Sequence, residues 1–390
     1  MRTRTFPSAD PEQIALPMSG EGLPDIISLS QVDALLPRYL GENPDGAVPA
    51  HPPNIDAPAG CSMQGGSDFE QLTSLSHLFW CWRKARVAKS RKARVQRFDQ
   101  DALRYLLIIQ QRLRNDTFVF GPYRYFQVIE KKRRDVVDSP MKDRVVHWVL
   151  YEHLTAIWQK RFIHDSYGNI RDRGTHAAVK RAAEFARKPV NKYVLQIDLS
   201  KFFYSVQHSH LKHAVLRHLG DQRVRDLVIR LIDSFTTDNR YDDLFSENSS
   251  YRQNSQKGMP LGNLTSQLFC NILLNDFDHW VKEKRGVRHY IRYVDDMLFF
   301  GESKTELRAL SGTLIDYLDS IGLIVNPRKM NIVPLAQGVP FLGYIIWPNH
   351  VSAGWRIRKG YAAAISAPHL IQNGKVDAYR TCFRYTGSSR

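Results

Sequence analysis

Long apolar segments and paired cysteines are both absent from this sequence of 390 residues. No uninterrupted apolar run approaches the roughly 20 residues that a membrane-spanning helix needs, so we expect no membrane partner. The first residues lack the apolar stretch of a secretory signal, and we therefore expect a cytoplasmic protein. A disulfide framework and a zinc ribbon are not expected either, because no C-x-x-C pair occurs among the four cysteines, Cys61, Cys81, Cys270 and Cys382.

Acidic residues are scarce relative to basic ones. The chain has 55 Lys and Arg residues against 39 Asp and Glu residues, which gives a net charge of +16 and a pI near 9.7. Such an excess favours a polyanionic partner, either nucleic acid or an anionic membrane surface. Residues 1–66 are the exception, with 3 basic and 8 acidic residues and 10 of the 19 prolines. We predict that they form an acidic, proline-rich and poorly ordered leader before a basic body, residues 67–390.

The spacing of apolar residues predicts a mixture of helices and strands in the basic body. Helical spacing covers residues 75–86, 101–114, 143–158, 208–235, 263–283 and 304–321. Strand-like patterns cover residues 123–137, 193–200, 289–301, 323–333 and 339–347. This order predicts an α+β fold in which an antiparallel sheet is layered with helices.

A strongly basic run occupies residues 83–97, in which eight of fifteen residues are Lys or Arg. Basic runs are usually solvated surfaces. Here the charges alternate with Trp82, Val87 and Val95, which favours an amphipathic helical surface that binds phosphates. We therefore expect structured RNA or a small helical accessory protein to bind near this run.

Three aspartates provide the strongest indication of chemistry. Asp198 ends an apolar strand, and Asp295 and Asp296 lie in a Tyr-Val-Asp-Asp segment between two apolar runs. Asp is common at turns and strand ends, so each residue alone has a structural explanation. Adjacent carboxylates between apolar strands repel one another, however, and close packing raises their pKa values. Two Mg²⁺ ions between them and Asp198 would remove this conflict and would promote in-line phosphoryl transfer, as in nucleotide polymerisation.

These segments resemble the reverse transcriptases. The Tyr-Val-Asp-Asp hairpin is similar to their catalytic hairpin, and VLQIDLSKFF, residues 194–203, is similar to their first palm motif. Five further segments follow the order expected for the family. They are similar to the fingers segment (residues 130–150), the insertion shared by bacterial and group II intron relatives (162–179), the nucleotide-support motif (258–278), the last palm motif (322–330) and the primer grip (341–344). The resemblance implies a right-hand polymerase. We expect the basic N-terminal helix and the fingers in residues 67–190, the palm in residues 191–344, and a short, basic helical thumb in residues 345–390.

The nucleotide-support motif indicates which type of reverse transcriptase the sequence resembles. Most reverse transcriptases carry Gln-Gly-x-x-x-Ser-Pro, whereas here Leu261 stands in place of the Gln and Gln267 in place of the Pro. This pattern is similar to the reverse transcriptases of diversity-generating retroelements, which copy a template RNA into DNA with frequent errors at adenines. That resemblance implies a template RNA, an RNA/cDNA duplex and deoxynucleoside triphosphates as partners, and a small basic accessory protein in a ribonucleoprotein.

Two other functions stay open at this point. One is another prokaryotic reverse transcriptase, of the anti-phage or group II intron type, with the same chemistry and a different biological output. The other is an inactive RNA-binding protein with a polymerase fold, against which the presence of all three aspartates argues.

The resemblance also assigns roles to the aspartates. It implies that Asp198 and Asp295 are the principal ligands of two Mg²⁺ ions, for which Mn²⁺ would be a substitute. Asp296 would be a secondary ligand, and the backbone carbonyl of Leu199 would contribute as well.

Further roles concern the substrate. Phe203 matches the aromatic gate that excludes a ribose 2′-hydroxyl, although a Phe here also suits the core. Lys132 and Arg134 match residues that bind the triphosphate, with exposed hairpin charges as the alternative. Lys329 matches a lysine that donates a proton to the leaving pyrophosphate, with a solvated loop lysine as the alternative. The residues expected to support the nucleotide are Leu261, Gly262 and Gln267; apolar packing is the alternative for the Leu.

Overall fold

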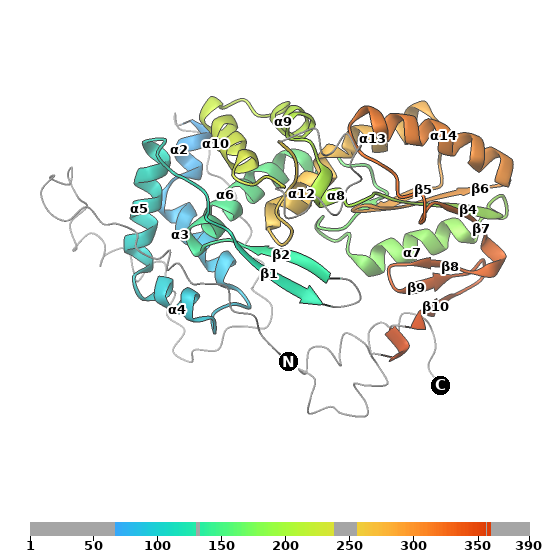
Figure 1. The fold of residues 1–390 in the computed structure, drawn as a ribbon, viewed down its shortest axis with the longest axis horizontal. Helices are drawn as coiled ribbons and strands as arrows, with labels where there is room; N and C mark the ends of the chain where they lie inside the picture. The colour runs from blue at the N-terminus through green and yellow to red at the C-terminus, as the bar shows by residue number, and fades with distance from the viewer. Residues whose placement is uncertain (1–66, 130–132, 238–255, 356, 360–390) are drawn as a thin grey trace, which may run out of the picture. The chain divides into compact units, whose positions relative to one another are not determined.

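A computed structural model describes residues 67–129, 133–237, 256–355 and 357–359 (Figure 1). The chain divides into two units, Met1–Gln64 and Gly65–Arg390, and every described residue belongs to the second unit. The predicted acidic leader, residues 1–66, therefore lies outside the described residues. Helices and strands both make up the second unit, which confirms the predicted mixed α+β fold. Within the described ranges, no helix is long and apolar enough to cross a membrane.

A five-stranded sheet with the order β3-β5-β6-β4-β7 contains the predicted catalytic segments. Every neighbouring pair is antiparallel except β3 and β5, which are parallel. The predicted hairpin over residues 289–301 is confirmed as β5 and β6, with Val294 and Asp295 in the turn between them. The five strands are β3 (Ser166–Tyr167), β4 (Tyr193–Asp198), β5 (Tyr290–Tyr293), β6 (Asp296–Gly301) and β7 (Asn331–Pro334).

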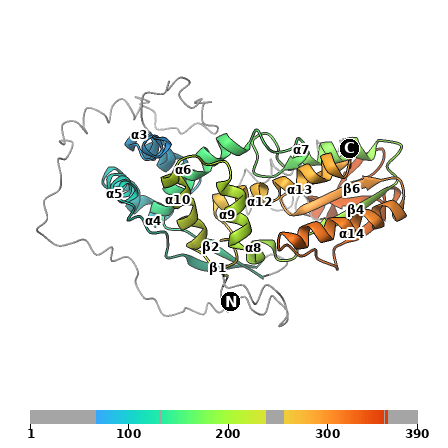
Figure 2. The ribbon, with the colours of Figure 1, turned by 90° about the horizontal axis from the view of Figure 1, so that it is seen from above.

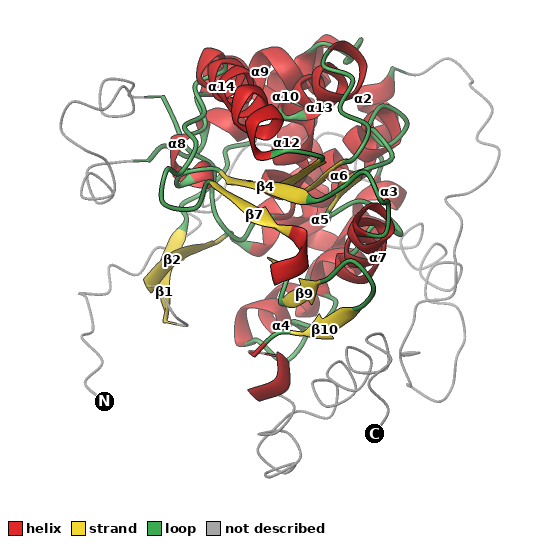
Figure 3. Cartoon of the chain, turned by 90° about the vertical axis from the view of Figure 1, so that its right-hand side faces the viewer, coloured by secondary structure: helices red, strands yellow, loops and turns green. Residues whose placement is uncertain are grey.

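Apolar cores lie on both faces of this sheet, because side chains alternate between the faces of a strand. On β4, Leu195 and Ile197 contribute to a core that also contains apolar residues of α14 (Lys304–Ser320). Val194 contributes to a second core together with α7 (Thr175–Ala186). Figures 1 and 3 show α14 on one side of the sheet and a smaller three-stranded sheet on the other. That smaller sheet consists of β8 (Val339–Phe341), β9 (Tyr344–Ile346) and β10 (Val351–Ala353).

The remaining described elements are mostly helical, and α6 (Met141–Trp158) lies among them. This helix is apolar on several faces, which is typical of a helix buried among others. Helices α3, α5 and α12 pack against it. Figure 2 shows α3, α5 and α6 at the end opposite the sheet, with α12 between them and the sheet. The helices are α2 (Asp68–Leu72), α3 (Leu75–Arg86), α4 (Ala93–Gln100), α5 (Ala102–Arg114), α8 (Phe202–Ser205), α9 (His208–Leu216), α10 (Gln222–Asp233), α12 (Leu264–Leu273) and α13 (Asn275–His279).

A two-stranded hairpin precedes α6. Its strands, β1 (Arg124–Ile129) and β2 (Arg133–Asp138), pair antiparallel, and this confirms the two short strands predicted over residues 123–137. The hairpin ends beside α6, because only Ser139 and Pro140 separate β2 from the helix.

The basic run over residues 83–97 is not one helical surface, so that prediction is wrong. Helix α3 ends at Arg86, α4 begins at Ala93, and Ala88 between them has a left-handed φ of 58°. Trp82 and Val95 are buried as expected, whereas Val87 is exposed. The run therefore presents its charges from two helices and the turn that joins them.

Two longer helices are also interrupted. The stretch 208–235 is divided into α9 and α10 because the carboxylate of Asp221 accepts hydrogen bonds from the backbone N–H groups of Arg223 and Val224 and so caps the second helix. The stretch 263–283 changes direction at Leu274, after which α13 leads into a π-helical turn, Trp280–Lys284. Apolar spacing alone does not reveal such breaks, because both pieces bury the same face.

The C-terminal elements differ from the predicted short helical thumb. Strand β9 crosses the predicted boundary between residues 191–344 and 345–390, so residues 345 and 346 belong to the three-stranded sheet. Strand β10 follows in the same sheet. Residues 360–390, which carry most of the predicted thumb, lie outside the described ranges.

Candidate active site

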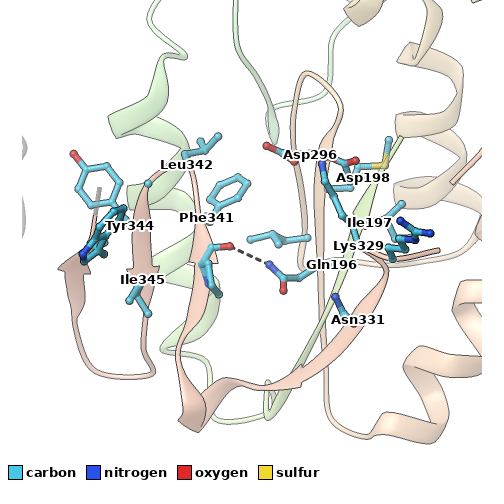
Figure 4. A pocket seen from close by; sticks show the side chains of 17 residues that line it. Gln196, Ile197, Asp198, Asp296, Lys329, Asn331, Phe341, Leu342, Tyr344 and Ile345 are labelled. Atoms are coloured by element: carbon cyan, nitrogen blue, oxygen red, sulfur yellow. Dashed lines mark hydrogen bonds and ion pairs between the residues drawn. The ribbon is translucent and has the colours of Figure 1, made fainter. Parts of the chain in front are cut away.

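Two of the three predicted catalytic carboxylates meet where β4 and β6 lie side by side. In the antiparallel register, Asp198 at the end of β4 stands opposite Asp296 at the start of β6. Asp295 immediately precedes Asp296 in the turn. Figure 4 shows the side chains of Asp198 and Asp296 next to one another. Sequence positions 98 residues apart are thus brought together by strand pairing.

Crowding of like charges changes the acidity of Asp296. Burial raises its pKa most, the charges of Asp295 and Asp198 raise it further, and Lys329 lowers it, with the result that the pKa is about 7. A divalent cation among these oxygens would offset the repulsion, and carboxylate oxygens are ligands that Mg²⁺ prefers. In the described part of the chain no three acidic, His or Cys side chains are already gathered to hold a metal ion. The chemistry of the carboxylates nevertheless fits one.

Lys329 provides the positive charge at this site. Its Nζ lies 2.5 Å from Oδ1 of Asp198, and the lysine side chain is 50% exposed while the aspartate side chain is 13% exposed. The backbone holds the lysine in place, because the carbonyl of Asp198 accepts from the N–H of Asn326 at 2.8 Å and the carbonyl of Asn326 accepts from the N–H of Lys329 at 3.0 Å. The predicted proton donor is therefore paired with a predicted metal ligand.

Leu199, whose backbone carbonyl is a predicted metal ligand, follows Asp198 in the chain. Its side chain is buried, and its backbone forms an isolated antiparallel bridge with Val325. The next residue, Ser200, donates its N–H to the carbonyl of Ile324 at 2.7 Å. The segment before Lys329 thus fixes the backbone of Asp198 and of the two residues that follow it.

A pocket of about 520 Å³ adjoins the carboxylates. Asp198, Asp296 and Lys329 line one side of it, and the turn between β8 and β9, which belongs to the predicted primer grip, lines the other (Figure 4). Gln196 joins the two sides by donating from Nε2 to the carbonyl of Pro340 at 3.0 Å. The pocket thus opens a volume large enough for a nucleotide unit directly beside the carboxylates.

The predicted nucleotide-support segment contacts the β1–β2 hairpin. The carbonyl of Leu261 accepts a hydrogen bond from the N–H of Val137 at 2.8 Å. Gly262 has a φ of +115°, and a Cβ at this position would lie 2.8 Å from the carbonyl oxygen of Val137. Glycine is therefore required here for the backbone conformation and for the close approach.

Sequence reasoning missed the buried polar residues that hold this segment. Ser139 donates from Oγ to Oδ1 of Asn263 at 2.5 Å, and Nδ2 of Asn263 lies 3.3 Å from Nε2 of His147. Nδ1 of the same histidine lies 2.8 Å from Oγ1 of Thr265. Burial, helped by the charge of Arg144, lowers the pKa of His147 to about 3, so the ring stays neutral and uses one nitrogen as donor and one as acceptor. Only the tertiary fold reveals this chain of contacts.

The other predicted substrate residues lie on several elements. Phe203 is partly buried, its ring meets that of Phe202 edge-on at 5.5 Å, and its carbonyl accepts from the N–H of Met259 at 2.6 Å. Gln267 is partly buried on α12. Arg134 lies on β2 opposite Val128 of β1. Lys132 lies outside the described residues.

A group of positive charges lies next to the β1–β2 hairpin and includes members that sequence reasoning did not single out. Arg94 and Arg144 bind different oxygens of the Asp138 carboxylate. Burial lowers the pKa of Lys89 to about 8, with further lowering by the charges of Arg144, Lys92 and Arg94. Burial also lowers the pKa of Arg94, and the charges of Arg144 and Arg124 lower it further. We call this group the cationic cluster: Lys89, Lys92, Arg94, Arg124 and Arg144.

Comparison with known proteins identifies a family and relatives that match much of the chain. The family described as reverse transcriptase (RNA-dependent DNA polymerase) matches residues 129–346. Protein YkfC of Escherichia coli (strain K12) is 26% identical over 312 residues, which are 68% of this chain and 79% of that protein. A putative COX1/OXI3 intron 1 protein of Saccharomyces cerevisiae is 23% identical over 300 residues, which are 62% of this chain and 34% of that protein.

Solved structures of telomerase also resemble the chain. Apo telomerase from Candida tropicalis has a TM-score of 0.44 at 11% identity, and the match covers 60% of this chain and 49% of that one. Telomerase from Candida albicans in complex with a fragment of telomeric RNA has a TM-score of 0.43, also at 11% identity, over 61% and 47% of the two chains. The chain thus spans about half the length of these telomerase chains. The family match over residues 129–346 spans more than half of the present sequence and includes the paired aspartates, so the chain belongs to the reverse transcriptase (RNA-dependent DNA polymerase) family.

Proposed function

We propose that the protein is an RNA-directed DNA polymerase that acts at Asp198, Asp295 and Asp296. The observation that carries this proposal is the direct pairing of Asp198 with Asp296 across β4 and β6, beside the pocket of about 520 Å³. Membership of the reverse transcriptase family supports a template RNA and deoxynucleoside triphosphates as substrates. The proposed product is an RNA/cDNA duplex.

The three carboxylates and the backbone carbonyl of Leu199 would hold two Mg²⁺ ions, for which Mn²⁺ would substitute. Reverse transcriptases generally use divalent metal ions, and the raised pKa of Asp296 supports a need for positive charge here. When bound, such ions stabilise the charge that develops on the attacking and leaving oxygens of phosphoryl transfer. The carboxylates of this chain would orient the primer terminus and the triphosphate toward one another.

Lys329 is the proposed general acid. Its Nζ is paired with Asp198, and half of its side chain is exposed. With the Asp198 carboxylate serving as a metal ligand, the Lys329 ammonium would be available to contact the triphosphate. The lysine would then donate its proton to the leaving pyrophosphate.

Further residues are proposed to select the substrate. Phe203 would crowd a ribose 2′-hydroxyl and so favour deoxynucleotides. Arg134 of β2 and Lys132, which lies outside the described residues, would bind the triphosphate. Leu261, with its neighbours Gly262 and Gln267, would contact the incoming nucleotide and its template base. The hydrogen bond between Leu261 and Val137 supports this assignment, because it joins the nucleotide-support segment to the same hairpin.

The cationic cluster is the proposed binding surface for the template RNA. Two of its members, Arg94 and Arg144, bind Asp138, and the gathering of five basic side chains in one place favours phosphate groups as ligands. A small basic accessory protein in a ribonucleoprotein is a further proposed partner, in keeping with the type of reverse transcriptase that the nucleotide-support motif resembles.

The proposed biological output is error-prone cDNA for a diversity-generating retroelement. Leu261 and Gln267 support this type, because they stand where most reverse transcriptases carry Gln and Pro. A second candidate is a group II intron-like enzyme, which is favoured by the similarity to the yeast intron 1 protein. The two candidates share the chemistry and differ in the errors that they introduce.

Primer extension on an RNA template tests the proposed chemistry. Purified protein, an annealed DNA primer and deoxynucleotides are expected to give full-length cDNA with Mg²⁺ and none with EDTA. Replacing deoxynucleotides by ribonucleotides is expected to stop extension. RNA binding without any extension would contradict the proposal and would instead indicate an inactive RNA-binding protein.

Sequencing the cDNA from the same reaction distinguishes the two candidate outputs. An excess of errors opposite template adenines is expected for the diversity-generating type. An even, low error spectrum would contradict that type and would favour the intron-like enzyme.

A further inference from the structure

The turn that carries Asp295 contains a residue in an unfavourable backbone conformation. Val294 has a φ of 56°, in the left-handed region, and its branched side chain makes this conformation costly. A β-branched residue remains in such a conformation only when the surrounding structure determines it. The contacts around Val294 therefore indicate what directs the catalytic turn.

The side chain of Arg292, two residues earlier on β5, is the main source of that support. Its exposed fraction is 0%, and all five of its N–H donors have acceptors. Nε and Nη2 donate to the two oxygens of the buried Asp278 at 2.8 and 2.5 Å, and Nη2 also donates to Oγ of Ser166 at 2.8 Å. Nη1 donates to the carbonyl of Val294 and to Oδ1 of Asn271, both at 2.9 Å.

A second set of contacts supports Val294 from the neighbouring strand β3. Its N–H donates to the carbonyl of Tyr167 at 3.2 Å. A Cβ on Gly168 would lie 2.7 Å from Cγ2 of Val294, so the glycine leaves room for the valine. Asn271 connects both sets, because its Nδ2 donates to the carbonyl of Gly168 at 2.7 Å.

We propose that Arg292 is a positioning residue, which fixes the left-handed conformation of Val294 through its Nη1 and thereby directs Asp295 and Asp296 toward Asp198. The argument rests on the proposed function, since it assumes that these carboxylates bind the divalent ions. The ion pair with Asp278 fixes the guanidinium plane, and Asn271 sets the direction of Nη1. The buried ion pair with Asp278 thus holds the Arg292 side chain rigidly, and the hydrogen bond from its Nη1 reaches the turn.

A double-substitution cycle with a metal-binding readout tests this role. Mn²⁺ binding is measured by electron paramagnetic resonance on the full chain without substrate, and Asp198→Asn defines the contribution of the catalytic site. Arg292→Lys keeps the positive charge beside Asp278 and removes the bond to the Val294 carbonyl, so we expect Mn²⁺ binding to weaken about tenfold. Adding Val294→Asn is expected to restore most of that loss, because Asn tolerates the left-handed conformation.

Arg217→Lys is the matched control. Arg217 also binds an aspartate with two nitrogens, Asp276, at 2.7 and 2.8 Å, but none of its described contacts reaches the turn. Its Mn²⁺ binding is expected to equal that of the wild type. Equal losses in Arg217→Lys and Arg292→Lys, or no restoration by Val294→Asn, would overturn the positioning role and leave Arg292 as a purely structural ion pair.

A second variant covers the case in which Arg292→Lys does not fold. Asn271→Ala leaves the Arg292–Asp278 pair intact and removes the amide that directs Nη1, so we expect Mn²⁺ binding about threefold weaker than in the wild type and restored by Val294→Asn. Unchanged binding in folded Asn271→Ala would overturn the proposal. If the wild type itself has no Mn²⁺ site that depends on Asp198, the proposed function fails instead, so the two failures are distinguishable.

Discussion

The cationic cluster and the carboxylate site, which consists of Asp198, Asp295 and Asp296, are opposite in charge and alike in construction. In the cluster, positive charges lie around one carboxylate, that of Asp138. In the carboxylate site, negative charges lie around one ammonium, that of Lys329. In both places burial adds to like-charge repulsion. Burial and repulsion together lower the pKa of Lys89 to about 8 in the cationic cluster. They raise the pKa of Asp296 to about 7 in the carboxylate site.

The comparison indicates that the two places require different ligands. An excess of buried or half-buried charge of one sign costs stability until a ligand of the other sign neutralises it. Phosphates are the proposed ligands of the cationic cluster, and divalent cations are the proposed ligands of the carboxylate site. Binding of RNA and synthesis of DNA are therefore expected to depend on separate residues. Substitutions in the cationic cluster and in the carboxylate site test that separation.

The largest effect is expected for the carboxylate site. Asp198→Asn keeps the size of the side chain and removes its charge, so DNA synthesis is expected to fall by about 1,000-fold or more, since bound metal ions contribute several kcal/mol to transition-state stabilisation. Asp296→Asn is expected to be less severe. Asp316→Asn, an exposed substitution on α14, is the control and is expected to retain activity. Primer extension rates of the three variants measure the difference, and substantial synthesis by Asp198→Asn would remove the metal assignment.

A smaller effect is expected for the cationic cluster. Replacing Lys89, Lys92 and Arg124 by Gln is expected to weaken RNA binding about 30-fold and to reduce the slope of log K against log salt by about 0.7 for each lost phosphate contact. Fluorescence anisotropy at several salt concentrations measures both quantities. The control removes the same charge elsewhere, from the exposed cations Lys180, Lys284 and Arg308. Equal losses in the two triple variants would mean that net charge, rather than this cluster, binds the RNA.

Leu261 lies beside the cationic cluster, because its carbonyl accepts a hydrogen bond from the N–H of Val137, next to Asp138. A Gln side chain would offer a hydrogen bond that only a well-placed nucleotide satisfies, which is worth about 1 kcal/mol or nearly tenfold in errors. Leu261→Gln is therefore expected to lower misincorporation, most clearly opposite template adenine, while synthesis continues. Sequencing cDNA from both enzymes on one template measures this. Identical error spectra would assign Leu261 to apolar packing.

The smallest effect is expected in the pH dependence of stability without metal. Asp296 has a folded pKa of about 7 against an ordinary 3.8, so the folded state binds more protons between these values and stability falls as pH rises through them. Asp296→Asn is expected to reduce the fall in melting temperature between pH 4.5 and 7.5 in EDTA by about 3 °C, the shift that roughly 1 kcal/mol produces in large domains. An unchanged fall would contradict the crowding of carboxylates.

The cationic cluster has the opposite pH dependence. Lys89 has a folded pKa of about 8 against an ordinary 10.5, so the folded state binds fewer protons between these values and stability rises as pH rises through them. Lys89→Gln is expected to reduce this rise between pH 7.5 and 10, as measured by thermal unfolding in the same buffers. A rise of the same size in both proteins would mean that the lysine is not repelled by its neighbours.

The sequence was sufficient to predict features that depend on local pattern. The hairpin of β5 and β6 and the strand β4 follow from apolar runs that end in aspartates, and the motif order identified Lys329 as part of the same site. Breaks within helices were missed, since both halves of a broken helix keep the apolar spacing that was used to predict it. The break at Leu274 is an example.

The spacing of residue types in the sequence does not predict contacts between distant segments. Asn263 and His147 are joined across 116 residues, and Arg292 meets Ser166 across 126 residues. Arg144 is an ordinary charged residue in the sequence, and only its position with Arg94 on the carboxylate of Asp138 assigns it to the cationic cluster. Such buried polar contacts are specific to the tertiary fold, because each partner is satisfied by a residue that no spacing rule identifies.

Single-turnover DNA synthesis, measured as a function of RNA template concentration, tests the separation of binding from chemistry most directly. Three proteins are compared: the wild type, Asp198→Asn and the triple cationic variant. The account predicts that the cationic variant needs about 30-fold more RNA for half-maximal synthesis and then reaches the wild-type rate. It predicts that Asp198→Asn binds RNA as the wild type does and makes almost no DNA at any concentration. A cationic variant with a low maximal rate at saturating RNA, or an aspartate variant whose synthesis recovers with more RNA, would contradict it.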